Sequence, residues 1–150
     1  MKLNAFRGMF LVTDPHDFSI VCPTEILALS IRYEEFKAVN AEIIGVSTDS
    51  VYSHRAWLQT PQEENGIQGT KYILASDRTH EVSESYGVLI EGEGIALRGL
   101  FIIDPEGILQ YAVVHNMDIG RSVDETLRVL EALQAGGLCG ANWEPGEDLL

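Results

Sequence analysis

The chain has 150 residues, 45% of them hydrophobic and 22% charged, which suffices for one domain with its own core. Its net charge of −13, from 10 basic and 23 acidic residues, excludes a dominant basic patch and therefore argues against nucleic-acid binding. No apolar run approaches the ~20 residues of a membrane-spanning helix, so we expect no membrane insertion. Polar residues interrupt the N-terminal stretch, so we expect no signal peptide and a cytoplasmic location.

The first half of the chain predicts two buried strands and two helices. Short apolar runs predict the strands, and apolar residues three or four positions apart predict the first helix. In chain order, the elements are a strand at 9–13, a helix from Cys22 to about Asn40, a strand at 42–47, a helix at 51–59 and a loop at 62–70. Residues 48–50 offer a cap for the second helix, and Pro61 ends it. The strand–helix–strand order predicts that the two strands lie parallel.

The second half predicts a short strand, a helix, a hairpin and a last helix. In chain order, these are a strand at 71–75, a helix through Tyr86 with N-cap residues at 77–79, an exposed acidic loop at 91–94, strands at 97–103 and 108–115, and a helix after the capping box at 122–125. Pro105 and Gly107 stand where a type I turn favours them, so the two strands form a hairpin. We expect the tail, 137–150, to lie extended on the surface. No repeat or linker divides the chain, and the pattern predicts a single α/β domain over 1–150.

Cys22 lies where the first strand leads into the first helix, directly before Pro23. Proline is favoured at the first helical position because its missing N–H would have no partner there. Backbone N–H groups and the positive end of the helix dipole favour a thiolate at such a place, which predicts a lowered pKa for Cys22. A buried structural cysteine is the alternative that position alone leaves open. The chain has two cysteines, with neither C-x-x-C nor zinc spacing, and in a reducing compartment this favours redox chemistry over a permanent disulfide.

The residues around Cys22 form the pattern Pro15-x-x-x-Ser19-x-x-Cys22, followed by Pro-Thr-Glu. This pattern resembles the Pro-x-x-x-Thr/Ser-x-x-Cys signature of the peroxiredoxins, and its flanks are similar to the typical two-cysteine branch (alkyl hydroperoxide reductase C or thiol-specific antioxidant). The resemblance extends from about Leu3 to Gly146. It implies a thioredoxin-like fold, a single domain with a central mixed sheet flanked by helices. It also implies a thiol-dependent peroxidase that reduces hydrogen peroxide and organic hydroperoxides without a cofactor.

The resemblance implies roles for five residues besides the nucleophile. Ser19 would supply a hydroxyl, Pro15 would shield the thiolate from water, and Arg98 would be the cation beside the sulfur. Glu25 and Arg121 match a family glutamate and arginine that support the site by holding the active arginine in place. From residue type alone, an arginine that begins an apolar strand is more often a surface residue.

Cys139 matches the family's resolving cysteine. The resemblance implies that a sulfenic acid at Cys22 condenses with Cys139 of another subunit to form a disulfide. The implied assembly is a homodimer, which the family extends to a decameric ring. The implied partners are the hydroperoxide substrate and a thiol reductant, such as a thioredoxin-like or flavin-linked disulfide reductase protein. We expect no metal because the four histidines lack ligand spacing, and we interpret His54 and Trp57 as packing or interface residues.

The sequence departs from the family pattern in several places. The strands that the family carries before the one at Met9 are missing. Asp14 stands where the family has tyrosine, and a carboxylate near the thiolate would raise the pKa of Cys22 and oppose its activation. The loop at 65–68 matches the family's Gly-Gly-Leu-Gly poorly. These departures leave open a catalytically weak oligomer that acts as a holdase or a peroxide sensor. A thiol–disulfide oxidoreductase would need a second cysteine at position 25, which is Glu25 here.

Overall fold

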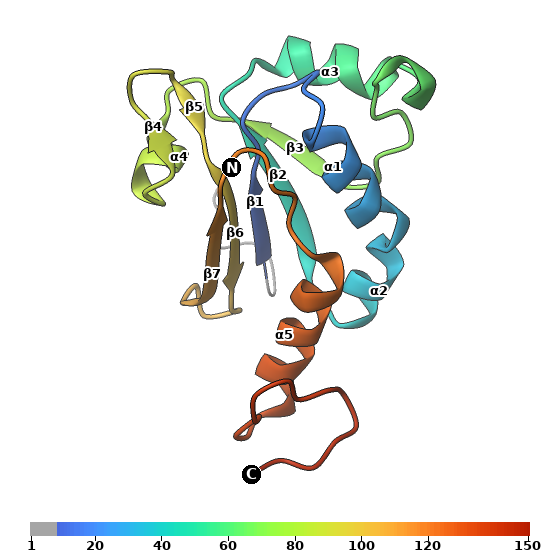
Figure 1. The fold of residues 1–150 in the computed structure, drawn as a ribbon, viewed down its shortest axis with the longest axis vertical. Coiled ribbons are helices and arrows are strands. Elements are labelled where there is room, and N and C mark those ends of the chain that lie inside the picture. The colour runs from blue at the N-terminus through green and yellow to red at the C-terminus, as the bar shows by residue number, and fades with distance from the viewer. Residues whose placement is uncertain (1–8) are drawn as a thin grey trace.

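The computed structural model of the protein describes residues 9–150 and contains a five-stranded mixed sheet with the strand order β3-β2-β1-β6-β7 (Figure 1). The strands are β1 (Met9–Thr13), β2 (Glu42–Ser47), β3 (Ile73–Ser76), β6 (Arg98–Ile103) and β7 (Leu109–His115), with a separate hairpin of β4 (Leu89–Ile90) and β5 (Ile95–Ala96). The helices are α1 (Cys22–Ile31), α2 (Tyr33–Ala38), α3 (Val51–Gln59), α4 (Glu81–Ser85) and α5 (Val123–Ala135), with a 3₁₀ turn at Gln62–Glu64. Residues 1–8, in which the sequence predicts no signal peptide, lie outside the described residues.

The central strand β1 joins the parallel and antiparallel halves of the sheet. β1 pairs in parallel with β2, as the strand–helix–strand order predicts, and antiparallel with β6. β2 pairs in parallel with β3, and β6 pairs antiparallel with β7 across the predicted turn, where Gly107 has a φ of 86°. This mixed sheet, flanked by helices in one domain, is a thioredoxin-like fold. Along residues 9–150, no helix combines the length and the hydropathy needed to cross a membrane.

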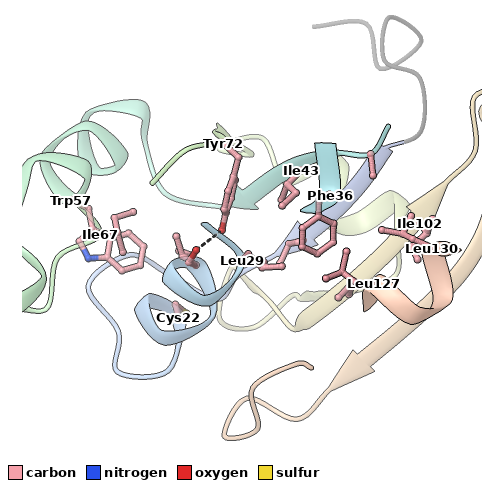
Figure 2. Packing of buried hydrophobic residues seen from close by; sticks show 14 residues of the cluster. Cys22, Leu29, Phe36, Ile43, Trp57, Ile67, Tyr72, Ile102, Leu127 and Leu130 are labelled. Atoms are coloured by element: carbon pink, nitrogen blue, oxygen red, sulfur yellow. Dashed lines mark hydrogen bonds between the residues drawn. The ribbon is translucent and has the colours of Figure 1, made fainter. Parts of the chain in front are cut away.

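Alternating residues of the central strands build two hydrophobic cores, one on each face of the sheet. Ile43 and Ile102 point to the face that α1, α2 and α5 cover, whereas their neighbours Ile44 and Phe101 point to the face beside α4 and the β4–β5 hairpin. Figure 2 shows the first core, with side chains from the three helices gathered around the sheet. In it the buried Tyr72 hydroxyl donates to the Ile26 carbonyl at 3.3 Å, which ties the chain before β3 to α1.

One local prediction was wrong, one was confirmed, and one hairpin was missed. The helix expected over 22–40 is broken at Arg32, which leaves helical geometry and pairs with Glu35 and with Asp124 of α5. The prediction that residues 77–79 cap the next helix is confirmed, because the Asp77 carboxylate accepts the backbone N–H groups of Val82 and Ser83 at the start of α4. The acidic loop at 91–94 is the turn of the β4–β5 hairpin, which the sequence analysis did not predict.

Candidate active site

Cys22 is the first residue of α1 and is completely buried. Between the end of β1 and this cysteine runs an eight-residue loop, 14–21, in which Pro15 is also buried. The Cys22 backbone N–H donates to the Ser19 Oγ at 3.3 Å, so this hydroxyl lies at the first turn of the helix. Because the sulfur has no solvent contact in this conformation, a peroxide or a second thiol reaches it only after the loop or the first helical turn moves.

Arg98, the first residue of β6, brings a cation to the sulfur from a distant part of the sequence. One guanidinium nitrogen, Nη1, donates to Cys22 Sγ at 3.3 Å and to Glu25 Oε2 at 2.7 Å, while Nε donates to the Met117 carbonyl at 2.6 Å. The residue is only 3% exposed, so the surface position that its residue type favours is wrong here. Three acceptors around one planar group fix the direction in which the guanidinium points.

Glu25 lies between Arg98 and Arg121 and binds both. Arg121 donates to Glu25 from its backbone N–H, from Nε and from Nη2, at 2.6, 2.8 and 3.0 Å. The Nη1 of Arg121 reaches the carbonyls of Thr13 and Gly99, so it also joins the ends of β1 and β6. Burial opposes ionisation of Glu25, but the two arginines outweigh burial and lower its pKa. The carboxylate therefore stays charged and holds both guanidinium groups.

Asp14 enters the same cluster, where the sequence alone predicted only that it lies near the thiolate. It is 3% exposed, and its Oδ1 accepts from Arg121 Nη2 at 2.6 Å. Burial, with a smaller contribution from the Glu25 charge, raises the pKa of Asp14 to about 6 against the attraction of Arg121. The cluster thus contains two guanidinium groups, two carboxyl groups and one thiol.

The pKa of Cys22 is raised in this conformation, so the lowering expected from the helix N-terminus alone is wrong. Burial of the sulfur is the main cause, and the Asp14 charge adds to it, as the sequence predicts. The hydrogen bonds to Ser19 and Arg98 and the charge of Arg98 act in the opposite direction. Arg98 therefore supports the thiolate against burial, while Asp14 opposes it.

His54 and Asp17 hold the loop that carries the cysteine, a role that the sequence analysis missed when it assigned His54 to packing. His54 Nδ1 lies 2.8 Å from Asp17 Oδ2, and its Nε2 lies 3.3 Å from the Ala75 carbonyl of β3. Burial disfavours the imidazolium, but Asp17 outweighs burial and raises the pKa of His54. On the far side of the loop, Asn65 donates to the Ser19 carbonyl at 3.0 Å.

Cys139 lies far along the chain from this cluster, beyond the C-terminal end of α5 (Figure 1). Its Sγ is 3.7 Å from the Ala132 carbonyl of the same helix, and the residue is partly exposed. The prediction of an extended tail is wrong, because the tail packs back against α5. Trp143 is buried, and its carbonyl accepts a hydrogen bond from Arg128 of α5 at 2.9 Å. The structure joins Ser19, Glu25, Arg98 and Arg121 into one hydrogen-bonded cluster with Cys22 and buries Pro15 in the preceding loop, but it does not bring Cys139 there.

The arrangement can support nucleophilic chemistry at sulfur. A thiol in contact with a fixed guanidinium has a cation to stabilise its anion and a donor for an oxygen atom that approaches it. Among the described residues, no group of three or more His, Cys, Asp or Glu side chains is arranged to hold a metal ion.

Replacing Arg98 by alanine should raise the pKa of Cys22 further and slow its alkylation at neutral pH. A hydrogen bond to a charged group contributes about 1.5–3 kcal/mol, which corresponds to about tenfold to a hundredfold less thiolate. Arg98→Lys keeps the charge but not the planar guanidinium, so its thiolate fraction should lie between those of the wild-type protein and Arg98→Ala. The measurement is the iodoacetamide alkylation rate of Cys22 against pH in a Cys139→Ser background. An alkylation profile that Arg98→Ala leaves unchanged would show that the 3.3 Å contact does not stabilise the thiolate.

Comparison with known proteins gives consistent results. Residues 1–112 match the AhpC/TSA family. The chain is 63% identical over 150 residues to YkuU of Bacillus subtilis (strain 168), covering 100% of this chain and 82% of the relative. It is 57% identical over 154 residues to the chloroplastic 2-Cys peroxiredoxin BAS1 of Hordeum vulgare, covering 98% of this chain and 73% of the relative. The reduced 2-Cys peroxiredoxin of Plasmodium vivax superposes with a TM-score of 0.93 at 41% identity, covering 95% of this chain and 76% of the other.

Proposed function

Because the chain belongs to the AhpC/TSA family and is a thiol-dependent peroxidase of the peroxiredoxin type, we propose that Cys22 is its peroxidatic nucleophile. The Cys22 thiolate attacks one oxygen of a hydroperoxide, the O–O bond breaks, and the second oxygen leaves with a proton as water or an alcohol. Cys22 is thereby oxidised to a sulfenic acid. The substrates are hydrogen peroxide and organic hydroperoxides.

The observation that carries this proposal is the contact between Arg98 Nη1 and Cys22 Sγ, which Glu25 and Arg121 support from behind. The guanidinium lies where negative charge develops, on the sulfur before attack and on the peroxide oxygens during it. Pre-organised donors in a water-poor site lower the barrier because they need no rearrangement at the moment of reaction. Ser19 and Pro15 complete the proposed site, with a hydroxyl at the first helical turn and a buried ring in the preceding loop.

A peroxide-consumption assay with dithiothreitol as the reductant tests the nucleophile. We expect turnover by the wild-type protein and none above background by Cys22→Ser, because a serine hydroxyl is not ionised near neutral pH and does not form a sulfenic acid. Cys139→Ser is the matched control: it should keep turnover, because dithiothreitol can reduce the Cys22 sulfenic acid directly. Full peroxide consumption by Cys22→Ser would contradict the assignment.

We further propose that Cys139 resolves the sulfenic acid across a subunit interface. Its thiol attacks the Cys22 sulfenic acid, water leaves, and an intersubunit disulfide forms. Two observations support pairing between subunits. Arg121, which precedes α5, binds the Cys22 cluster, whereas Cys139 follows the other end of this 13-residue helix, about 20 Å farther along its axis. A disulfide requires Cα atoms within about 7 Å, so pairing within one chain would require α5 to unfold.

The proposed working unit is a homodimer, and further contacts between copies of this chain would extend it to a ring. β7 is the last strand of the five-stranded sheet, so one of its edges has no strand beside it among the described residues. Leu109 and Val114 of β7 are about half exposed. A bare edge with apolar side chains favours pairing with a second copy. A dithiol protein, thioredoxin-like or linked to a flavin disulfide reductase, would reduce the disulfide in the cytoplasm and close the cycle.

A further inference from the structure

The cluster around Cys22 has balanced charges before the thiol ionises. Arg98 and Arg121 contribute two positive charges, and Glu25 and Asp14 contribute two negative charges when both are ionised. A thiolate at Cys22 would then add an uncompensated negative charge to a buried site. Four of these five residues are at most 6% exposed, and the side chain of the fifth, Arg121, is 4% exposed. Loss of one carboxylate charge would restore the balance.

The groups that face Asp14 come from several elements. They are Arg121 from the segment before α5, Glu25 and Cys22 from α1, Arg98 from β6, Tyr72 from the segment before β3, and the Asp17–His54 pair across a small cavity. Glu25 is held ionised by two arginines, and Asp17 is paired with His54. Burial raises the pKa of Tyr72 well above its ordinary value, so that Tyr72 stays neutral. Within the five-residue cluster, Asp14 and Cys22 remain as the two groups whose ionisation changes its charge; His54, whose pKa is raised, lies outside the cluster across the cavity.

We propose that Asp14 and Cys22 share a single negative charge, so that the thiolate forms together with a protonated Asp14 and an ionised Asp14 keeps Cys22 as a thiol. Asp14 makes no hydrogen bond to the sulfur; it acts through its charge and through the chain of contacts Arg121–Glu25–Arg98, as a positioning residue for the thiolate. The inference rests on the proposed function in that the Cys22 thiolate is the reacting species. The pKa of Asp14, about 6, lies where a small change in pH changes its charge.

This coupling has a defined consequence for pH dependence. The state with a thiolate and a neutral Asp14 binds as many protons as the state with a thiol and an ionised Asp14, so their ratio does not change with pH. Below about pH 6 the thiolate fraction should rise tenfold per pH unit, as for an isolated thiol. Above about pH 6 it should level off, because each further Asp14 that ionises suppresses the thiolate. It should rise again only when both groups ionise together.

The test compares iodoacetamide alkylation of Cys22 in Cys139→Ser and in Cys139→Ser carrying Asp14→Asn, across a pH series. Asparagine keeps an oxygen acceptor for Arg121 but cannot ionise. Below about pH 6 the two proteins should react at equal rates, because Asp14 is neutral in both cases. Above that pH the Asp14→Asn protein should be alkylated faster than the protein with Asp14, by about tenfold if the charge of Asp14 shifts the pKa of Cys22 by one unit. Asp77→Asn, which replaces a carboxylate that is also 3% exposed but is bonded to Ser83, should keep a ratio of one throughout.

A rate ratio that is the same at every pH would overturn the inference, because a purely structural effect of Asp14→Asn would not follow the titration of Asp14. If Asp14→Asn fails to fold, the profile of the Cys139→Ser protein alone decides: a levelling above about pH 6 supports the coupling, and an unbroken rise through that pH contradicts it. Alkylation needs no peroxide, so the two proposals fail separately. Loss of turnover in Cys22→Ser with a constant alkylation ratio would leave the peroxidase site intact and remove only the coupling.

Discussion

Glu25→Ala should lower the free energy of unfolding by about 3–5 kcal/mol, the largest loss of stability that we expect from a single change in the site. The substitution leaves the Arg98 and Arg121 guanidinium groups, which are 3% and 4% exposed, without the carboxylate that binds both. Only the Asp14 carboxylate then remains, and it contacts Arg121 but not Arg98 among the ion pairs of the described residues. A buried charge without its partner keeps the full cost of its desolvation.

Urea denaturation at one fixed protein concentration measures this loss, since an oligomer's apparent stability depends on concentration. Glu125→Ala is the matched control, because it also removes a carboxylate bound to an arginine, Arg128, at 2.7 Å, but the Glu125 side chain is 46% exposed. Its ion pair should contribute about 1 kcal/mol or less. Equal losses in the two variants would show that burial of the Glu25 pair does not set its contribution.

Oxidised wild-type protein should run on a non-reducing denaturing gel as a disulfide-linked dimer that reductant converts to monomer. The physical reason is that the length of α5 separates Cys22 from Cys139 within one chain. Cys139 of a second chain can pair with Cys22 without unfolding α5. Because Cys22 is completely buried, local unwinding of the first turn of α1 should accompany the bond. The two outcomes differ in kind, since a bond with one sulfur from each chain gives a linked dimer and a bond with both sulfurs from one chain gives a monomer.

Mixing Cys22→Ser with Cys139→Ser supplies the decisive control. Each variant alone lacks one sulfur of the pair, whereas a mixed dimer has one complete Cys22–Cys139 pair and should give a linked band after peroxide treatment. Mass spectrometry of the band should identify a peptide that joins the two positions. A monomeric oxidised wild-type band with an internal Cys22–Cys139 bond would contradict the intersubunit pairing and leave the peroxidase assignment unaffected.

Local chemistry in the sequence determined where most elements begin and end. Ser50 and Ser122 accept the backbone N–H groups of Ser53 and Glu125, as capping predicts, and Gly136 ends α5 with a φ of 73°. These signals are reliable because each cap involves residues only a few positions apart. The sequence could not predict the break at Arg32, because no Gly or Pro marks it and one of its partners, Asp124, lies 92 residues away.

The sequence also located Cys22, the proposed nucleophile, and, through the family pattern, the side chains that gather around it. What only the tertiary structure decided is how these charges balance. Asp14 binds Arg121 across 107 residues, and Arg98 reaches Cys22 across 76. Whether a carboxyl group is charged depends on its burial and on which guanidinium faces it, and neither follows from its neighbours in the chain. For the same reason the helix position that lowers a cysteine pKa by itself is outweighed here by the burial of the sulfur.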